Sequence, residues 1–212
     1  MDARIEAVLA DYDARMRREA ERFGSPTPGE PPPRRDDLLL AVGPQTGRLM
    51  NELIKGSGAR TIVELGTSYG YSGIWLAEAA RATGGRVISF DVAAEKQAYA
   101  REALKKAGLD GFVEHLTGDA TALLEGFEGP IDFVLLDIWK DLYLPCLELF
   151  FPKLAPGAIV VADNMLRPAE ARPDALAYRR AVRAKPGISS VLLPIGSGLE
   201  ISRLAGPQDE GL

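Results

Sequence analysis

Carboxylate side chains recur in this 212-residue chain at the points where apolar runs end. Asp91, Asp137 and the pair Asp163-Asn164 each follow a run rich in Val, Ile, Leu or Phe, and Asp119 comes shortly after another. The end of a buried strand does not need a carboxylate for packing, so the repetition indicates a ligand. Carboxylate and amide oxygens suit a hard cation such as Mg²⁺, and a carboxylate also accepts hydrogen bonds from sugar hydroxyls.

A glycine-rich segment, Glu64–Ser72, follows the first of these apolar runs. Gly66 and Gly70 are spaced G-x-x-x-G, which differs from the G-x-G-x-x-G that seats a pyrophosphate. Glycines let a ligand approach the backbone, and the next helix's N-terminus together with the Ser72 hydroxyl can hold a carboxylate. Glu64 would repel a phosphate and attract an amine. These preferences fit the methionine end of S-adenosylmethionine, and the alternative is a tight strand-to-helix turn without a ligand.

Asp91 ends the second apolar run, 25 residues after Gly66 (91 − 66). An acid at this place in a nucleotide-binding fold accepts hydrogen bonds from ribose hydroxyls. The alternative is that Asp91 caps a helix that begins near Ala94. Together with the glycine-rich segment, Asp91 favours an adenosine cofactor.

Asp137 and the pair Asp163-Asn164 are the candidate ligands of a magnesium ion. They end two strands that we expect to be neighbours, so they can converge although 26 residues separate them (163 − 137). The alternatives are a helix cap for Asp137 and a turn for Asp163-Asn164. Lys140 follows Asp137 by one helical turn, and a nearby cation would help it give up its own proton and act as a base. The alternative for Lys140 is a solvated surface lysine.

Apolar periodicity places these residues in an alternation of strands and helices. Strands are expected at 61–65, 86–90, 112–116, 131–136 and 158–162, followed by a hairpin of 188–193 and 199–204. Helices are expected at 2–22, from 43 to Gly56, and at 71–81, 94–107, 120–124, 142–154 and 169–184. The pattern predicts an α/β fold of the Rossmann-like, doubly wound class. Its seven-stranded, mostly parallel sheet would have helices on both faces and an antiparallel edge hairpin.

The length suits a single domain, residues 1–212. We expect an N-terminal helix and a Pro-rich lid segment at 1–40, a cofactor-binding catalytic core at 41–204 and a flexible tail at 205–212. Residues 165–180 are expected to form acceptor walls together with 1–40.

Net charge and cysteine usage limit the possible partners. The net charge of −5 gives no support for nucleic-acid or anionic-membrane binding. No apolar run approaches the ~20 residues of a membrane span, and the N-terminus does not read as a signal peptide. Cys146 is the single cysteine, so we expect a cytoplasmic protein with a small core residue at that position. His115, the single histidine, lies mid-strand and is expected to be structural.

Two of these motifs carry a family resemblance. Residues 135–143, with the sequence LLDIWKDLY, and the segment Glu64–Ser72 resemble the catechol O-methyltransferase family of class I S-adenosylmethionine-dependent methyltransferases. The chain is also similar to the cation-dependent enzymes that act on caffeoyl-CoA-type substrates. The likeness runs from about residue 42 to residue 204.

The resemblance implies a role for each matching residue. Lys140 matches the general base, and Asp137, Asp163 and Asn164 match the metal ligands. Val42, Glu64, Gly66, Thr67, Ser72, Asp91 and Ala120 match cofactor positions. Asp119 and Asp137, which each follow an expected strand, are placed with them.

The chain departs from the family in two places. Ile138 stands where the catechol enzymes carry a histidine. An ungapped count places Val191 where they carry a glutamate that holds the second substrate hydroxyl, and Glu200 falls elsewhere on the hairpin.

We therefore expect a magnesium-dependent O-methyltransferase, a monomer or homodimer, that methylates one hydroxyl of a small catechol or other vicinal diol. A methyltransferase of the same fold acting on a hydroxycinnamoyl ester, RNA or protein stays open. So do a nicotinamide-dependent oxidoreductase and a catalytically silent cofactor-binding module.

Overall fold

The computed structural model describes residues 1–24 and 37–207. Residues 25–36 of the predicted lid segment and residues 208–212 of the predicted tail lie outside this range. The described residues form a seven-stranded sheet in the order β3-β2-β1-β4-β5-β7-β6. The strands are β1 Thr61–Leu65, β2 Arg86–Asp91, β3 Val113–Thr117, β4 Ile131–Leu136, β5 Leu154–Ala162, β6 Ile188–Leu193 and β7 Leu199–Leu204.

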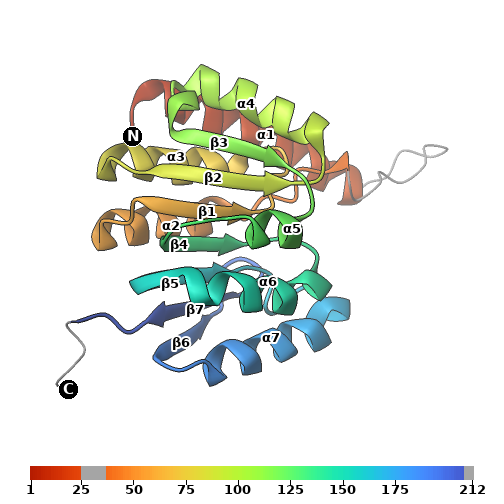
Figure 1. The fold of residues 1–212 in the computed structure, drawn as a ribbon. Coiled ribbons are helices and arrows are strands. Elements are labelled where there is room, and N and C mark those ends of the chain that lie inside the picture. Colours follow the sequence, from red (N-terminus) through yellow and green to blue (C-terminus); the bar gives the residue numbers. More distant parts are fainter. Residues whose placement is uncertain (25–36, 208–212) are drawn as a thin grey trace.

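The first five strands are parallel, and β7 lies antiparallel between β5 and β6 (Figure 1). The carboxyl ends of the parallel strands consequently meet at one edge of the sheet. This arrangement confirms the predicted fold class, including the antiparallel hairpin at one side.

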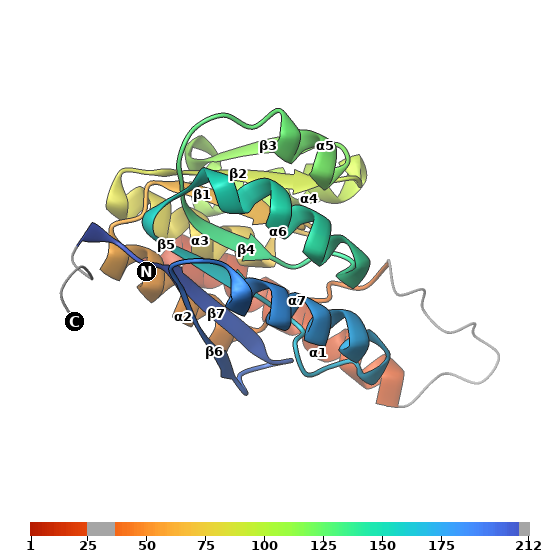
Figure 2. The same ribbon diagram turned by 60° about the horizontal axis from the view of Figure 1, so that its bottom comes forward.

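Helices cover both faces of the sheet (Figures 1 and 2). The strands show why: Ile62 packs into the core on one face and its neighbour Val63 into the core on the other. One face carries α1 Ala3–Gly24, α2 Pro44–Ser57, α3 Tyr71–Thr83 and α4 Ala94–Ala107. The other carries α5 Ala120–Glu125, α6 Tyr143–Phe150 and α7 Arg172–Ala184. Within the described ranges, no helix is long and apolar enough to cross a membrane.

Several predicted boundaries were wrong by a few residues. Gly58, with φ 68°, ends α2 rather than Gly56, because its left-handed conformation lets its N–H close the last turn. The helix predicted at 142–154 is shorter, because Pro152 has no N–H to continue it and a 3₁₀ turn follows instead. A 3₁₀ turn also precedes α7, which begins at Arg172 and not at Ala169.

The hairpin loop between β6 and β7 packs back onto the carboxyl edge of the sheet. The N–H groups of Met165 and Leu166 donate to the carbonyls of Gly198 at 2.9 Å and Ser197 at 2.8 Å. A Cβ added to Gly196 would lie 3.2 Å from Thr46 Oγ1 at the start of α2. The loop therefore joins the segment after Asn164 to the segment around residues 42–46.

Candidate active site

The glycine-rich loop after β1 lies directly against the end of β4. Gly66 has φ 104°, and a Cβ added there would lie 2.1 Å from the carbonyl oxygen of Asp137. Any side chain at residue 66 would push the two strand ends apart. The N–H of Asp137 donates to the Leu65 carbonyl at 2.9 Å, which fixes the same junction. The structure thus brings two predicted site residues, Gly66 and Asp137, into contact.

Glu64 is fully buried in β1, and its register partner Ser89 lies beside it on β2. The hydroxyls of Ser72 and Ser89 donate to its two carboxylate oxygens at 2.6 Å and 2.5 Å. The Thr67 hydroxyl pairs with that of Ser89 at 2.6 Å. Burial raises the pKa of Glu64 to about 7, against the lowering effect of both serine hydrogen bonds. The Ser72 hydroxyl, which we expected to face a ligand carboxylate, is directed at Glu64.

Asp91 braces the glycine-rich loop rather than capping the next helix. Its carboxylate accepts a hydrogen bond from the N–H of Ser68 at 2.7 Å and another from that of Ala93 at 2.8 Å. The N-cap of α4 is Ala93, with no side-chain cap. A carboxylate has about four acceptor positions, so Asp91 keeps capacity for further donors such as ribose hydroxyls.

Asp119 caps α5. It is exposed and accepts hydrogen bonds from the N–H groups of Thr121 at 3.0 Å and Ala122 at 3.1 Å. The Thr121 side chain contributes most to a lowered pKa of Asp119. The Asp119 carboxylate thus caps the start of α5, while Ala120 beside it is buried.

Asp137 and Asp163 place two carboxylates at the ends of the neighbouring strands β4 and β5. Asp163 is 2% exposed, and its carboxylate accepts a hydrogen bond from the Asn164 N–H at 2.6 Å. Burial, followed by repulsion from Asp137, raises the pKa of Asp163 to about 7. Burial also raises the pKa of Asp137, while Lys140 opposes the change. Asp137 forms no side-chain cap on the helix that follows, so that alternative is wrong.

Lys140 lies between these acids and the wall formed by α6. Its ammonium donates to the carbonyl of Ile138 at 3.1 Å, to Asn164 Oδ1 at 3.0 Å and to the Tyr143 hydroxyl, and lies 4.0 Å from Asp137 Oδ1. A solvated surface lysine would not be held in this way. The predicted base therefore lies among the three predicted metal ligands.

The donor set at this end of the site suits a divalent cation. Burial raises the pKa of both acids, and Asp137 adds to the effect on Asp163, so a positive charge bound beside them would favour their ionised forms. The part of the chain that the structure describes holds no group of three His, Cys, Asp or Glu side chains suited to a metal. A third protein ligand would consequently be the amide oxygen of Asn164. Such a set of few hard ligands is typical of Mg²⁺, which keeps positions for water or substrate.

Two departures from the catechol enzymes are visible in space. Ile138 packs toward the glycine-rich loop, with its Cγ2 3.2 Å from the place a Gly66 Cβ would take. Val191 lies in the edge strand β6 with 51% of its surface exposed. Glu200 is fully buried, and Arg179 and Arg183 bind its carboxylate at 3.0 Å and 2.6 Å.

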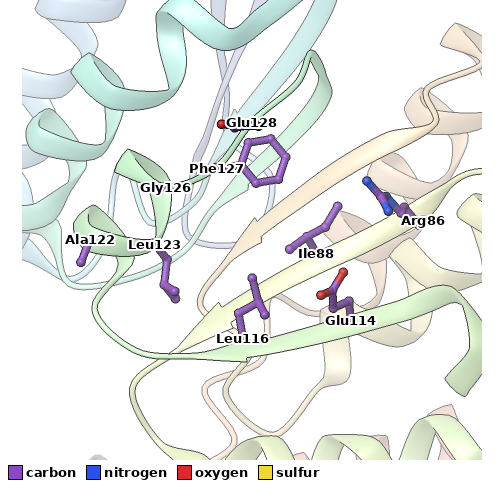
Figure 3. Close-up of a pocket in the computed structure, with 9 residues that line it drawn as sticks. All are labelled: Arg86, Ile88, Glu114, Leu116, Ala122, Leu123, Gly126, Phe127 and Glu128. Carbon is purple, nitrogen blue, oxygen red and sulfur yellow. The ribbon is translucent and has the colours of Figure 1, made fainter.

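A concavity of about 310 Å³ lies away from these residues (Figure 3). Its walls come from β2, β3 and α5, with Ile88, Leu116, Leu123 and Phe127 forming the apolar part. None of its lining residues is a predicted site residue. His115 does not line it. That histidine is partly buried, and burial lowers its pKa to about 4, which fits a neutral structural side chain.

Comparison with known proteins decides the family. Residues 63–165 match a methyltransferase domain family. A probable O-methyltransferase of Mycobacterium tuberculosis is 34% identical over 163 residues, which are 72% of this chain and 67% of that protein. The chain belongs to the S-adenosylmethionine-dependent O-methyltransferases.

Two further relatives extend the comparison of this O-methyltransferase. A catechol O-methyltransferase of Niastella koreensis is 33% identical over 132 residues, 60% of this chain, and the match spans only 59% of that enzyme. The structure of the Bacillus cereus O-methyltransferase in complex with SAH superposes with a TM-score of 0.73 at 25% identity. It covers 96% of this chain and 91% of that one.

Sequence reasoning missed two residues of the candidate site. Tyr143 is fully buried, and its hydroxyl lies 2.9 Å from the Leu136 carbonyl and 3.1 Å from that of Asp163, besides accepting from Lys140. Its position three residues after Lys140 was a signal that could have revealed it. Ser89, the second partner of Glu64, carried no comparable signal, because only the strand register brings it there.

Proposed function

We propose that this protein transfers the methyl group of S-adenosylmethionine to one hydroxyl of a small catechol or other vicinal diol, in a reaction that requires Mg²⁺ or another divalent cation. The main support for this proposal is the contact between Gly66 and Asp137. It joins a loop suited to an amino-acid cofactor to a cluster suited to a cation, so that donor and acceptor would meet at one junction.

The chain's own residues suggest how each reactant is held. Glu64 would attract the cofactor's ammonium, since a buried carboxylate with a raised pKa gains a counter-ion there. Asp91 would hold the ribose through its remaining acceptor positions. The strip at Val42 and Gly43 would cover the methionine end, and Thr67, Ser72, Asp119 and Ala120 would complete the cofactor wall.

Asp137, Asp163 and Asn164 would hold the cation. The cation held there would supply positive charge, which lowers the pKa of an acceptor hydroxyl beside it. Lys140, in its neutral amine form, would take the proton of that hydroxyl at Nζ. The acceptor oxygen would then bond to the methyl carbon as the bond from that carbon to the sulfonium sulfur breaks, and S-adenosylhomocysteine would be the leaving group. Holding both reactants in line supplies a further share of the rate, roughly 7–11 kcal/mol where the geometry is good.

The acceptor is the part of the proposal that relatives support least directly. The name of the Niastella koreensis relative points to a catechol. A hydroxycinnamoyl ester is the second candidate, because the short hairpin loop at 194–198 lacks a counterpart of the catechol enzymes' glutamate. The net charge of −5 disfavours RNA.

Transfer of a labelled methyl group tests the proposal. The purified protein is given labelled S-adenosylmethionine and a panel of catechols, flavonoids and hydroxycinnamoyl esters, with Mg²⁺ or with a chelator. We expect label in a vicinal diol only when Mg²⁺ is present. Labelling of a monophenol at the same rate in the presence of the chelator would contradict both the need for a cation and the need for a diol. A change in NADH fluorescence on addition of the protein, without methyl transfer, would favour the oxidoreductase.

A further inference from the structure

Helix α1 reaches the cofactor loop from outside the sheet. The Tyr12 hydroxyl donates to the carbonyl of Tyr69 at 2.6 Å. Tyr69 stands between Ser68, with φ 45°, and Gly70, with φ 87°. A left-handed residue other than glycine is costly to hold, so contacts on both sides of it matter. Asp91 holds this loop through the Ser68 N–H from within the sheet, and α1 holds it from the opposite side.

Arg15, one helical turn after Tyr12, makes the second contact with the loop. Its guanidinium carbon lies 4.0 Å from the centre of the Tyr69 ring and 5.4 Å from that of Tyr99. The two rings meet edge to face, with centres 5.4 Å apart. A guanidinium over an aromatic face is a favourable and directional contact. Arg15 therefore fixes the position of the Tyr69 ring, which lies between α1 and the glycine-rich loop.

Arg15 also contacts the segment that leads to Val42. Arg15 Nε donates to Glu19 at 2.7 Å, and its Nη2 donates to the Asp37 carbonyl at 3.1 Å. The other carboxylate oxygen of Glu19 accepts the N–H of Leu39 at 2.9 Å. Leu40, next in the chain, is again a left-handed residue, with φ 45°. One connection of three side-chain contacts thus runs from Tyr69 to Leu39.

We propose that the Arg15–Glu19 pair is a strut that positions the two walls of the cofactor site relative to one another. One wall is the loop 66–70 and the other is the segment 37–43. The proposal rests on the proposed function, in which both walls contact S-adenosylmethionine. A wall that is already ordered loses less conformational entropy when ligand binds. Arg15 and Glu19 are positioning residues in this account, since they act through Tyr69 and Leu39.

The test measures S-adenosylhomocysteine binding by calorimetry, together with amide hydrogen exchange in the absence of ligand. Arg15→Met keeps the length and apolar stem of the side chain but removes the guanidinium. We expect it to weaken binding about three- to tenfold, the size of a lost cation–π contact plus a hydrogen bond. Exchange should accelerate in both 66–70 and 37–43. Glu19→Gln should act in the same direction, and the double variant should bind no more weakly than Arg15→Met alone, because both act through one connection.

Arg81→Met is the matched control. Arg81 pairs with Asp2 at 3.0 Å, so this variant also removes an ion pair of α1, but at the opposite end of the helix. It should leave affinity within twofold of the parent and leave exchange in both walls unchanged. Equal losses in Arg81→Met and Arg15→Met would overturn the strut in favour of a general role of α1 in stability.

The failure of the proposed function and the failure of the strut give different results. If the parent protein does not bind S-adenosylhomocysteine, the proposed function fails, while hydrogen exchange in the free protein still tests the strut. If the parent binds and Arg15→Met binds within twofold of it with unchanged exchange in 37–43, the strut is overturned and the proposed function stands.

Discussion

The two halves of the candidate site hold their carboxylates in opposite ways. In the cofactor half, Glu64 accepts hydrogen bonds from two serine hydroxyls, and Asp91 accepts hydrogen bonds from two backbone N–H groups. In the cation half, Asp163 is buried beside Asp137, and repulsion between the two adds to the effect of burial on the pKa of Asp163. The chain thus assembles the first half from its own donors, whereas the second half gathers negative charge that a bound cation would balance. Substitutions in the cofactor half should therefore affect mainly cofactor binding, and substitutions in the cation half should affect mainly cation-dependent turnover.

The largest effect is expected from Asp163→Asn, with Asn164→Ala as its companion. Either change should lower cation-dependent turnover by about 10³-fold or more, because Asp163→Asn removes the negative charge of one ligand and Asn164→Ala removes another ligand from a set of few. A metal supplies several kcal/mol of charge stabilisation. Binding of S-adenosylhomocysteine should stay within a few-fold of the parent, since the cofactor half remains intact. Calorimetry with Mg²⁺ and with S-adenosylhomocysteine measures both. Lost cofactor binding together with unchanged metal affinity would reverse the assignment of the two halves.

Lys140→Ala should lower turnover by about 10²–10⁴-fold, the usual share of proton transfer in catalysis. Affinity for cofactor and cation should move much less. The loss should also depend on the acceptor: a nitrocatechol is largely ionised near neutral pH and needs less help, so the variant should retain more activity on it than on an ordinary catechol. Equal losses on both acceptors would make Lys140 a positioning residue instead of a base.

Tyr143→Phe sharpens the assignment of Lys140. The ring would keep its edge contact with Tyr178, whose centre is 5.4 Å away, while the hydroxyl that accepts from Lys140 would be lost. We expect a fall in turnover of about tenfold, the order of one hydrogen bond to a charged group. In the Lys140→Ala background the same change should have little further effect on turnover, because its partner is already absent. Additive losses would show that Tyr143 acts on the fold and not on Lys140.

Much of this comparison could be predicted from the sequence, for a physical reason. Asp91, Asp137 and Asp163 stand at the ends of apolar strands, and a parallel sheet brings those ends together whatever the details of packing. The alternation of apolar and polar runs is strong enough to determine the number of strands. The chain positions of these residues therefore predicted the edge of the sheet on which they meet.

Contacts across the sheet could not be predicted in the same way. Ser89 reaches Glu64 through strand register, and Tyr143 reaches Asp163 through the packing of α6, neither of which a linear pattern contains. Asp119 follows a strand, as predicted, and the cap that its carboxylate makes on α5 was not predicted.

Asp91→Ala should weaken cofactor binding by roughly 10- to 100-fold, the value of one or two hydrogen bonds to a charged acceptor. The Michaelis constant for the cofactor should rise more than turnover falls, because binding to ribose is the same in the ground and transition states. Part of the loss would come from the Ser68 N–H, whose partner disappears. An unchanged Michaelis constant would limit Asp91 to that local contact.

The smallest expected effect is the release of a proton from Glu64 when ligand binds, and it tests the cofactor half alone. Burial raises the pKa of Glu64 from 4.5 to about 7, so between these values the folded protein binds a proton that the unfolded chain does not. The contribution of Glu64 to stability therefore falls as pH rises from about 4.5 to about 7. Near pH 7, roughly half of the molecules should carry this proton, given that pKa.

A ligand ammonium placed beside Glu64 would lower its pKa and release that proton. Binding of S-adenosylhomocysteine at pH 7 should accordingly release roughly half a proton, and affinity should increase with pH through this range. Calorimetry in buffers of different ionisation enthalpy measures the release, with a chelator present to keep the cation half unoccupied. Glu64→Gln is the matched variant, because it keeps the side-chain shape but does not titrate. Proton uptake, or the same release in Glu64→Gln, would show that the ligand ammonium lies elsewhere and that Glu64 is buried for structural reasons alone.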